Sequence, residues 1–334
     1  MSNGPITSTI NSMADVWEAY RDELEGVEDQ VRRNLDSSVT LVNTVAAHIL
    51  NSGGKRIRPL LLLLCARLCG YSGRNHHQLS SLVEFIHTAT LLHDDVVDDA
   101  DLRRGRSTAR KVWGNQISIL VGDYLYSKAM AQIVEFRSQG INEVLAEACT
   151  KMAEGEVLQL YYNGNPAMPE ADYLKIVEHK TAGLIAATCR MGAIIADAPE
   201  DRLDALFRFG QYVGIAFQVA DDTLDYTADG ARLGKTLGQD LRQGKATLPL
   251  LHLLEHCSEA DRGVIKDRME TRTLTEDDLS RMIHLMEEMG SIAYAMARAQ
   301  AFVVAAQREL EFFEDCTAKR ALMVAADYMV TRDR

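Results

Sequence analysis

The sequence predicts an all-α fold, in which a single large helical bundle takes up most of the chain. Only 6 prolines interrupt its 334 residues and runs of β-branched residues are few, so helix is favoured over sheet. Apolar residues recur with a period near 3.6 along almost every segment. Helices such as 78–93 and 205–220 are apolar on most sides, so they must lie inside a bundle.

The expected helices follow one another with short breaks of loop chemistry. Helices 13–34 and 37–51 end at Ser52-Gly53-Gly54, a turn signal. Pro59 opens the helix 59–70, because a proline costs nothing in the first turn, and Gly70 ends it. Three more helices, 78–100, 115–137 and 141–162, lead to Gly164-Asn165-Pro166.

The second half of the chain also predicts helices separated by short loops. Helix 170–197 ends at Ala198-Pro199, and helix 200–227 ends at a loop over 228–234. The remaining helices are expected at 246–256, 276–288, 290–313 and 317–331. No low-complexity linker divides the chain. Residues 1–12 are therefore expected to form a flexible tail and residues 13–334 one domain.

Composition narrows the function classes. The formal net charge of −12 argues against nucleic acid as a partner. The 6 cysteines form no CxxC pair, which indicates reduced thiols rather than a disulfide or zinc framework. The N-terminus lacks the features of a signal peptide, and the longest apolar run, residues 60–66, is too short to span a membrane. A cytoplasmic location is expected.

Two aspartate clusters carry the chemical signal. A long apolar helix ends in Asp94-Asp95-Val96-Val97-Asp98, and another ends in Asp221-Asp222-Thr223-Leu224-Asp225. Residues i and i+4 share a helix face, so each cluster crowds like charges, which is unfavourable unless a cation intervenes. Oxygen ligands favour Mg²⁺, which bridges carboxylates to phosphates. One such cluster is more often only an exposed helix end, but the pair indicates a metal site.

Cationic residues gather in the same parts of the chain. Gly53-Gly54-Lys55-Arg56-Ile57-Arg58 places three cations in a loop that enters a helix, where backbone N–H groups bind phosphate. Arg103-Arg104 follow the first cluster, and Lys235 and Lys245 follow the second. Taken singly, each is more often a solvated surface cation. Together they indicate a site for two polyanions.

These motifs resemble those of the trans-type isoprenyl diphosphate synthases. The matching segments are Gly54–Pro59, Glu84–Asp98, Leu102–Gly105, Gly122-Asp123, Lys180-Thr181, Phe217–Asp225 and Gly234–Leu251. The resemblance covers roughly residues 30–334, and the ending Arg332-Asp333-Arg334 looks like that of the bacterial octaprenyl diphosphate synthases. It implies an isoprenoid synthase bundle around a central hydrophobic cavity, with the two clusters facing each other across its mouth.

The resemblance also implies the roles of individual residues. About three Mg²⁺ ions are implied as cofactor. The metal site would use Asp94, Asp95, Asp98, Asp221, Asp222 and Asp225. The isopentenyl diphosphate site would use Lys55, Arg58, His87 and Arg104. The allylic diphosphate site would use Arg103, Lys180, Thr181, Gln218, Lys235 and Lys245. The chain-length residues would be Ala89 and Thr90, whose small side chains before Asp94 leave a tunnel open, and Leu145, which the resemblance implies as a candidate for the floor of the tunnel further down.

The expected reaction is ionisation of an allylic prenyl diphosphate and attack by isopentenyl diphosphate, with cations neutralising the leaving group. The expected enzyme is a long-chain all-trans polyprenyl diphosphate synthase. It would extend a farnesyl primer to octaprenyl diphosphate for quinone side chains, as a homodimer with transient membrane-surface contact. Nonaprenyl, decaprenyl and geranylgeranyl products stay open, as does a class I terpene synthase. A non-catalytic subunit or a plain helical scaffold would not explain two complete clusters.

Overall fold

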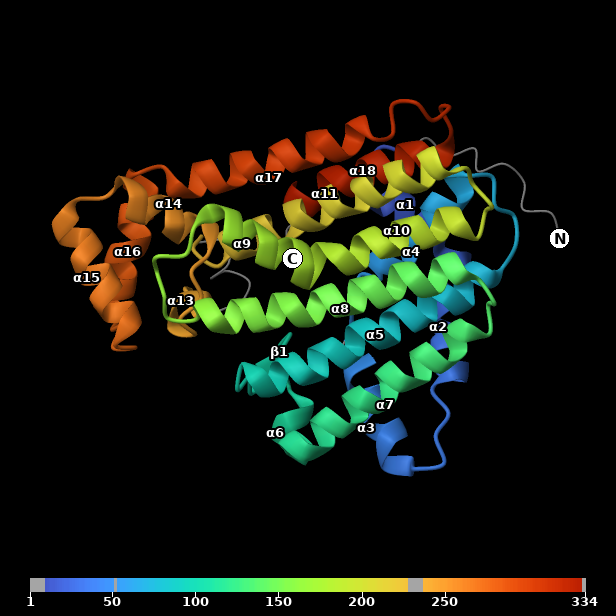
Figure 1. Cartoon of the computed structure of the whole chain (residues 1–334), viewed down its shortest axis with the longest axis horizontal. Coiled ribbons are helices and arrows are strands. Elements are labelled where there is room, and N and C mark those ends of the chain that lie inside the picture. Colours follow the sequence, from blue (N-terminus) through green and yellow to red (C-terminus); the bar gives the residue numbers. More distant parts are fainter. Residues whose placement is uncertain (1–9, 51–52, 228–236, 332–334) are drawn as a thin grey trace. The chain divides into compact units, whose positions relative to one another are not determined.

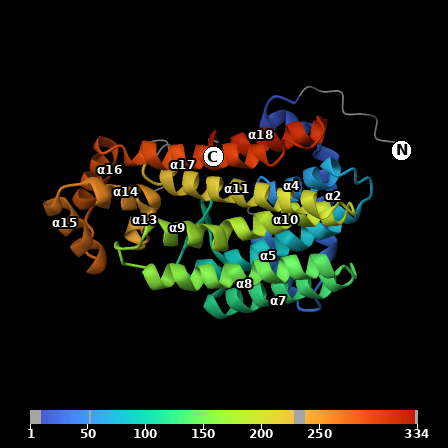
Figure 2. The same ribbon diagram turned by 45° about the horizontal axis from the view of Figure 1, so that its top comes forward.

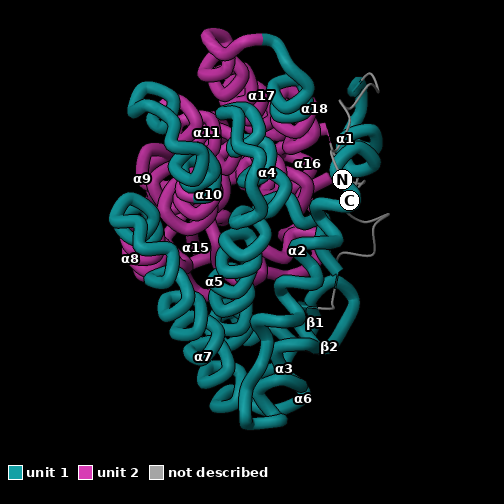
Figure 3. The backbone as a smooth tube through the Cα atoms, turned by 90° about the vertical axis from the view of Figure 1, so that its right-hand side faces the viewer, with its two compact units in different colours: residues 1–145, 188–204, 315–322 teal, residues 146–187, 205–314, 323–334 magenta. Residues whose placement is uncertain are grey.

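The computed structural model describes residues 10–50, 53–227 and 237–331 (Figure 1). The segment 228–234, the side chain of Lys235, most of the predicted tail and the ending 332–334 lie outside them. The chain divides into two compact units (Figure 3). Unit 1 comprises Met1–Leu145, Thr188–Asp204 and Asp315–Leu322, and unit 2 comprises Ala146–Ala187, Ala205–Glu314 and Met323–Arg334. The single domain predicted over 13–334 stays a prediction, because contacts alone do not show independent folding.

Unit 1 is built around one long buried helix, α5. Its elements are α1 (Met13–Ala19), α2 (Arg21–Asn34), α3 (Thr40–Leu50), α4 (Ile57–Leu68), α5 (Asn75–Val97), β1 (Leu102–Arg103), β2 (Arg106–Ser107), α6 (Ala109–Trp113) and α7 (Asn115–Val134). Helices α2, α4 and α7 pack along α5. Figure 1 shows α7 beside α5, and Figure 2 shows the same elements turned by 45°. This packing explains why α5 carries apolar residues on most sides.

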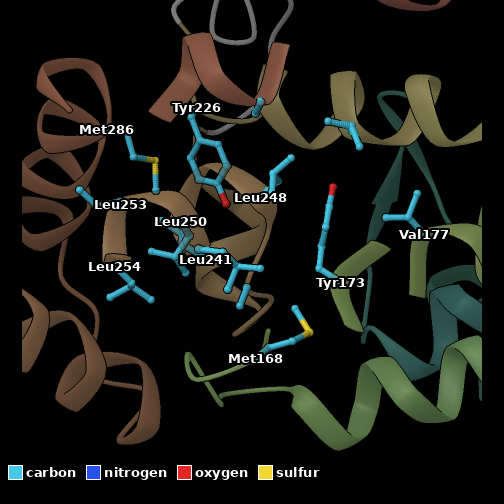
Figure 4. Packing of buried hydrophobic residues seen from close by; sticks show 14 of the residues in the cluster. Met168, Tyr173, Val177, Tyr226, Leu241, Leu248, Leu250, Leu253, Leu254 and Met286 are labelled. Carbon is cyan, nitrogen blue, oxygen red and sulfur yellow. The ribbon is translucent and has the colours of Figure 1, made fainter. Parts of the chain in front are cut away.

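Unit 2 contains most of the remaining helices. They are α9 (Glu170–Val177), the π-helix η1 (Glu178–Ala182), α13 (Gln239–Arg242), α14 (Leu248–His256), α15 (Glu259–Glu270), α16 (Glu276–Glu288) and α17 (Ser291–Arg308). Four helices contribute residues to both units: α8 (Gln139–Tyr162), α10 (Gly183–Ile194), α11 (Glu200–Leu224) and α18 (Thr317–Thr331). A buried apolar cluster from α9, α14, α16 and α17 forms the core of unit 2, and Tyr173 and Tyr226 lie within it (Figure 4).

The all-α prediction is confirmed, with local differences. Helices α16 and α18 have the predicted bounds. The predicted helix 13–34 is wrong in its continuity, because Tyr20 is at once the C-cap of α1 and the N-cap of α2. Helices α6, α13 and α15 and the two-stranded hairpin were not predicted from the sequence. Ser258 could have indicated the start of α15, because serine is a preferred N-cap residue. In the structure its side chain accepts a hydrogen bond from Asp261 N.

Among the described helices, no single one is both long and apolar enough to cross a bilayer. Helices α16 and α17 satisfy the length and composition criteria only as a pair, and they are bent by 62° where they join.

Candidate active site

The first aspartate cluster lies where α5 ends. Asp94 and Asp95 occupy its last turn, and Asp98 caps it, with its N–H donating to Asp94 O at 2.8 Å. Asp95 is fully buried, and its Oδ1 accepts a hydrogen bond from Arg103 Nε at 2.9 Å. Burial raises the pKa of Asp95, although Arg103 opposes the rise. Within the described residues its Oδ2 is buried without a hydrogen-bond partner, so this oxygen is available to a cation.

A tight hairpin carries the two arginines that follow. Strands β1 and β2 pair antiparallel with Arg103 opposite Arg106, so Arg104 and Gly105 form the turn. Both turn residues have positive φ, 50° and 73°, as two-residue hairpin turns require. The Arg104 guanidinium donates to Gly53 O. Gly54 leaves room for it, since a Cβ there would lie 3.3 Å from Arg104 Nη1. The hairpin was not predicted from the sequence, because Arg104-Gly105 is not one of the Asn-Gly or Asp-Gly pairs that usually mark such turns.

His87 lies halfway along α5 and marks a cationic cluster. The pKa of its imidazole lies well below the usual value, first because of burial and then because of four nearby guanidinium groups. Those groups belong to Arg56, Arg58, Arg103 and Arg104. The imidazole is therefore neutral near pH 7, and the cluster favours an anion. Arg58 supports this reading, because its Nε is buried with no hydrogen-bond partner among the described residues.

Arg56 holds the entry to α4 in place. It is the N-cap of this helix and has a left-handed backbone, with φ 47°. Its guanidinium bonds Glu28, Glu84 at 2.8 Å and the carbonyl of Leu50 at 3.0 Å. Because those acceptors occupy Arg56, it positions the loop. The roles predicted for Arg58 and Arg104 in binding a diphosphate stay predictions.

The other predicted residues of unit 1 lie on or near these elements. Lys55 is exposed in the loop before Arg56. Ala89 is buried in α5, and Thr90 Oγ1 donates to His87 O at 2.8 Å. Leu145 is fully buried in α8. These positions are compatible with a role in chain length but do not test it.

The Gly122-Asp123 motif has a structural explanation. His93 Nε2 lies 3.2 Å from both the Ile119 carbonyl and Asp123 Oδ1 of α7. A Cβ at Gly122 would lie 2.4 Å from the same nitrogen. The glycine therefore admits the imidazole between α5 and α7, just beside Asp94.

The second aspartate cluster ends α11. Asp222 is buried and accepts hydrogen bonds at 2.7 Å from the Tyr173 hydroxyl and from Gln218 Nε2. Burial raises the pKa of Asp222 to about 6, against the effect of these donors and of Lys245. Nothing in the sequence motifs indicated Tyr173, which reaches the cluster from α9. Asp221 lies beside Asp222 in the same turn.

Asp225 organises the chain that follows the second cluster. Its Oδ2 accepts a hydrogen bond from Asp240 N at 2.9 Å, and its carbonyl accepts one from Gly238 N at 2.8 Å. Burial raises the pKa of its carboxyl, while the Asp240 and Gln239 N–H groups and then Lys245 lower it. Lys245 is thus close enough to both Asp222 and Asp225 to lower their pKa values, and its role in binding the allylic diphosphate stays a prediction. The position of Lys235 lies outside the described residues.

Lys180 and Thr181 lie in the π-helix η1. Thr181 Oγ1 donates to Gln218 Oε1 at 2.8 Å, so Gln218 connects Thr181 to Asp222. Lys180 bonds Gln159 at 2.7 Å and forms an ion pair with Glu156. Short π-helices often occur at functional sites. The hydrophobic periodicity predicts an ordinary α-helix here, since it cannot detect one inserted residue.

Two glycines allow neighbouring helices to approach η1. A Cβ at Gly155 of α8 would lie 2.8 Å from Lys180 N. A Cβ at Gly214 of α11 would lie 2.5 Å from the Cα of Ala182. The π-helix is therefore fixed from two sides, which holds Lys180 and Thr181 in register with Gln218.

Comparisons with known proteins agree with this geometry. A family model described as polyprenyl synthetase matches residues 39–286. The chain is 40% identical over 326 residues to the octaprenyl diphosphate synthase of Escherichia coli, covering 97% of this chain and 100% of that one. It is 36% identical to a nonaprenyl diphosphate synthase of Rhodobacter capsulatus, over 94% of this chain and 96% of the relative.

Solved structures give the same result. A decaprenyl diphosphate synthase from Rhodobacter capsulatus superposes with a TM-score of 0.92 at 39% identity, covering 96% of this chain and 99% of that one. A polyprenyl synthase from Caulobacter crescentus, complexed with calcium and isoprenyl diphosphate, gives 0.93 at 37% identity, covering 98% and 100%. With two aspartate-rich helix ends, a cationic cluster and these full-length relatives, the chain belongs to the polyprenyl synthetase family of all-α prenyltransferases.

Proposed function

We propose that this chain is a long-chain all-trans polyprenyl diphosphate synthase that condenses isopentenyl diphosphate repeatedly onto farnesyl diphosphate and releases octaprenyl diphosphate. The observation that carries the proposal is the cluster of four guanidinium groups around neutral His87, on the same helix that ends in Asp94, Asp95 and Asp98. A synthase that elongates chains needs a second anion site beside its acidic site.

The residues fit Mg²⁺ as the cofactor. The Oδ2 of Asp95 is buried without a partner among the described residues, and burial raises the pKa values of Asp222 and Asp225. The charge of these carboxylates is therefore only partly compensated by the protein. Oxygen donors of this kind suit a hard divalent ion, and the Caulobacter relative was crystallised with calcium. The two Asp clusters would hold about three Mg²⁺ ions, which would neutralise charge on the departing diphosphate when bound.

Different side chains bind the two diphosphate substrates. Lys55, Arg58, His87 and Arg104 bind isopentenyl diphosphate. Arg103, Lys180, Lys235 and Lys245 bind the allylic diphosphate, and their charge stabilises it as it leaves. Thr181 and Gln218, joined at 2.8 Å, present oxygen dipoles to the allylic cation. Because no basic side chain is assigned to the step, the proton is lost to the released diphosphate.

The experiment is product analysis. The pure full-length chain, farnesyl diphosphate, labelled isopentenyl diphosphate and Mg²⁺ are incubated, and the dephosphorylated products are separated by chain length. Octaprenol as the main product is expected. Nonaprenol, decaprenol or geranylgeraniol would correct the length only. Absence of isopentenyl diphosphate consumption together with release of a hydrocarbon would instead indicate a class I terpene synthase.

The assembly we propose is a homodimer formed through α7. Ile119, Leu120 and Val134 of α7 are exposed, and Leu120 is 62% accessible. Such residues favour a contact with another protein surface. Light scattering should give twice the 37.1 kDa of one chain, and Leu120→Arg should shift it toward the monomer. Transient contact of the apolar product with a membrane surface, a cytoplasmic location and use of the product in quinone side chains stay predictions.

A further inference from the structure

A second group of metal-ligand side chains lies at the N-terminal ends of α2 and α5. Glu23 is in the first turn of α2, and His76 and His77 are in the first turn of α5. These helices pack along each other. His76 Nε2 and His77 Nε2 lie 2.9 and 2.8 Å from the same atom, Glu23 Oε2. Asp94 is 18 residues further along α5, about 27 Å at the helical rise, so this group is separate from the first aspartate cluster.

The group is enclosed and shaped by its surroundings. The His76 side chain is fully buried, and those of His77 and Glu23 are 17% and 16% accessible. Gly26 lies one turn after Glu23 on α2, and a Cβ there would lie 2.6 Å from His77 Cε1. The missing side chain is therefore what admits the second imidazole.

Arg67 binds one carboxylate oxygen of Glu23, and the two imidazoles share the other. Arg67 binds Glu23 Oε1 at 2.5 Å and the Tyr71 carbonyl at 2.5 Å, which fixes the carboxylate. Among the described residues, His76 Nδ1 is buried without a hydrogen-bond partner. Both imidazoles nevertheless direct Nε2 at Glu23 Oε2, so the atoms that would bind an ion converge on the carboxylate. Binding through Nε2 would place each ring proton on Nδ1.

We propose that Glu23, His76 and His77 form a site for one divalent transition-metal ion, with Zn²⁺ as the best match. The ligand atoms lie within 4.8 Å of one another, and two imidazoles with one carboxylate are a typical zinc donor set. Nitrogen donors select against Mg²⁺ and Ca²⁺. A fourth ligand would be water. The bound ion would join the start of α2 to the start of α5.

The test uses the full-length chain after chelation, with excess Mg²⁺ present to saturate the aspartate clusters. Zn²⁺ is titrated by calorimetry, and Co²⁺ is followed by the visible absorption of its low-coordinate complexes. One equivalent should bind. His77→Ala should weaken Zn²⁺ binding by about 100-fold, at least as much as loss of a group that only orients a ligand. His284→Ala, which removes an exposed histidine beside Glu288, and Asp94→Ala should both leave it unchanged.

Two further measurements make the result decisive. Circular dichroism checks that His77→Ala is folded, and Glu23→Gln, which nearly preserves the shape of the side chain, should lose Zn²⁺ to a similar extent. Equal Zn²⁺ affinity in wild type and either variant would overturn the site. So would absence of a stoichiometric equivalent, or its loss in Asp94→Ala instead. Prenyl transfer is not part of the readout, so this result and that of the product analysis are independent.

Discussion

At the scale of single residues, the site depends on carboxylates whose burial is only partly compensated. Within the part of the chain that the structure describes, Arg103 donates to Asp95, and Tyr173 and Gln218 donate to Asp222. Burial still raises the pKa of both groups. Carboxylates held in this way gain more from a divalent cation than exposed ones do, because water no longer screens their charge.

Asp94→Ala and Asp221→Ala should each lower kcat by about a thousandfold or more, because each removes a ligand of the ions that neutralise the leaving group. Steady-state kinetics at saturating Mg²⁺ measures the effect. Asp277→Ala, an exposed carboxylate in the first turn of α16, is the control and should be neutral. Near-normal rates in either cluster variant would remove that cluster from the mechanism.

Tyr173→Phe should raise the Mg²⁺ concentration for half-maximal activity by on the order of tenfold, because a hydrogen bond to a charged group is worth about 1.5–3 kcal/mol. It should also move the acidic limb of the pH profile upward, since the lost donor lowers the pKa of Asp222. Tyr226→Phe is the matched control, because this buried tyrosine bonds Thr247 instead. Identical Mg²⁺ dependence in the two variants would show that Tyr173 only fills space.

At the scale of elements, α5 and η1 do most to position the site. Helix α5 carries His87, Ala89 and the first aspartate cluster on one rigid support, so its side chains have fixed spacing along the axis. The π-helix places Lys180 and Thr181 against α8 and α11 through two glycines. Changes in either element should therefore alter function before they unfold the protein.

Ala89→Phe should shorten the main product to about three or four isoprene units, because Ala89 lies about 7.5 Å along α5 from Asp94 at 1.5 Å per residue. Chromatography of the dephosphorylated products measures the length. Ala89→Val serves as a graded comparison and should give an intermediate effect. Because Ala89 is buried, thermal unfolding of each variant must be checked for overpacking. An unchanged product would remove the chain-length role.

Gly214→Ala should lower the free energy of unfolding by about 1–3 kcal/mol, the usual cost of overpacking, since its Cβ would lie 2.5 Å from Ala182 Cα. It should also lower kcat by displacing Thr181 from Gln218. Gly263→Ala in α15 is the control, because nothing lies within 4 Å of its Cβ, and helix propensity predicts a gain of up to about 1 kcal/mol. Equal unfolding midpoints for the two variants would contradict this account.

At the scale of the whole molecule, much of the fold was predictable, because helices packed on several sides leave long apolar patterns. Both aspartate clusters and the cations near them were also visible as motifs. Tyr173 and the Glu23–His76–His77 group were not, because they meet only through packing of α9 on α11 and of α2 on α5. The hairpin and η1 were missed for a local reason, since each depends on one or two unusual backbone conformations.

Binding of Mg²⁺ should stabilise the folded chain more at pH 7.5 than at pH 5.5. The folded pKa of Asp222 is about 6 against an ordinary 3.8, so its contribution to stability in the metal-free protein is present below pH 3.8 and lost as pH rises through 6. Mg²⁺ binds the ionised form and offsets that loss. Thermal unfolding with Mg²⁺ or EDTA measures this, and Asp222→Asn should remove most of the pH dependence. An equal rise in Tm at both pH values would contradict it.

The π-helix η1 makes the segment Glu178–Ala182 sensitive to deletion of a single residue. A π-turn holds one residue more than an α-turn, so deleting a single residue from Glu178–Ala182 could restore regular winding. Such a deletion would leave α9 and α10 at nearly the same relative rotation, because the extra residue of a π-turn is accommodated within that turn, but it would move side chains within the segment by about 100°, one residue's share of a turn. Lys180 and Thr181 would then leave Gln159 and Gln218 while every flanking helix kept its composition. In this segment, residue number as well as residue identity therefore sets whether Lys180 and Thr181 reach Gln159 and Gln218.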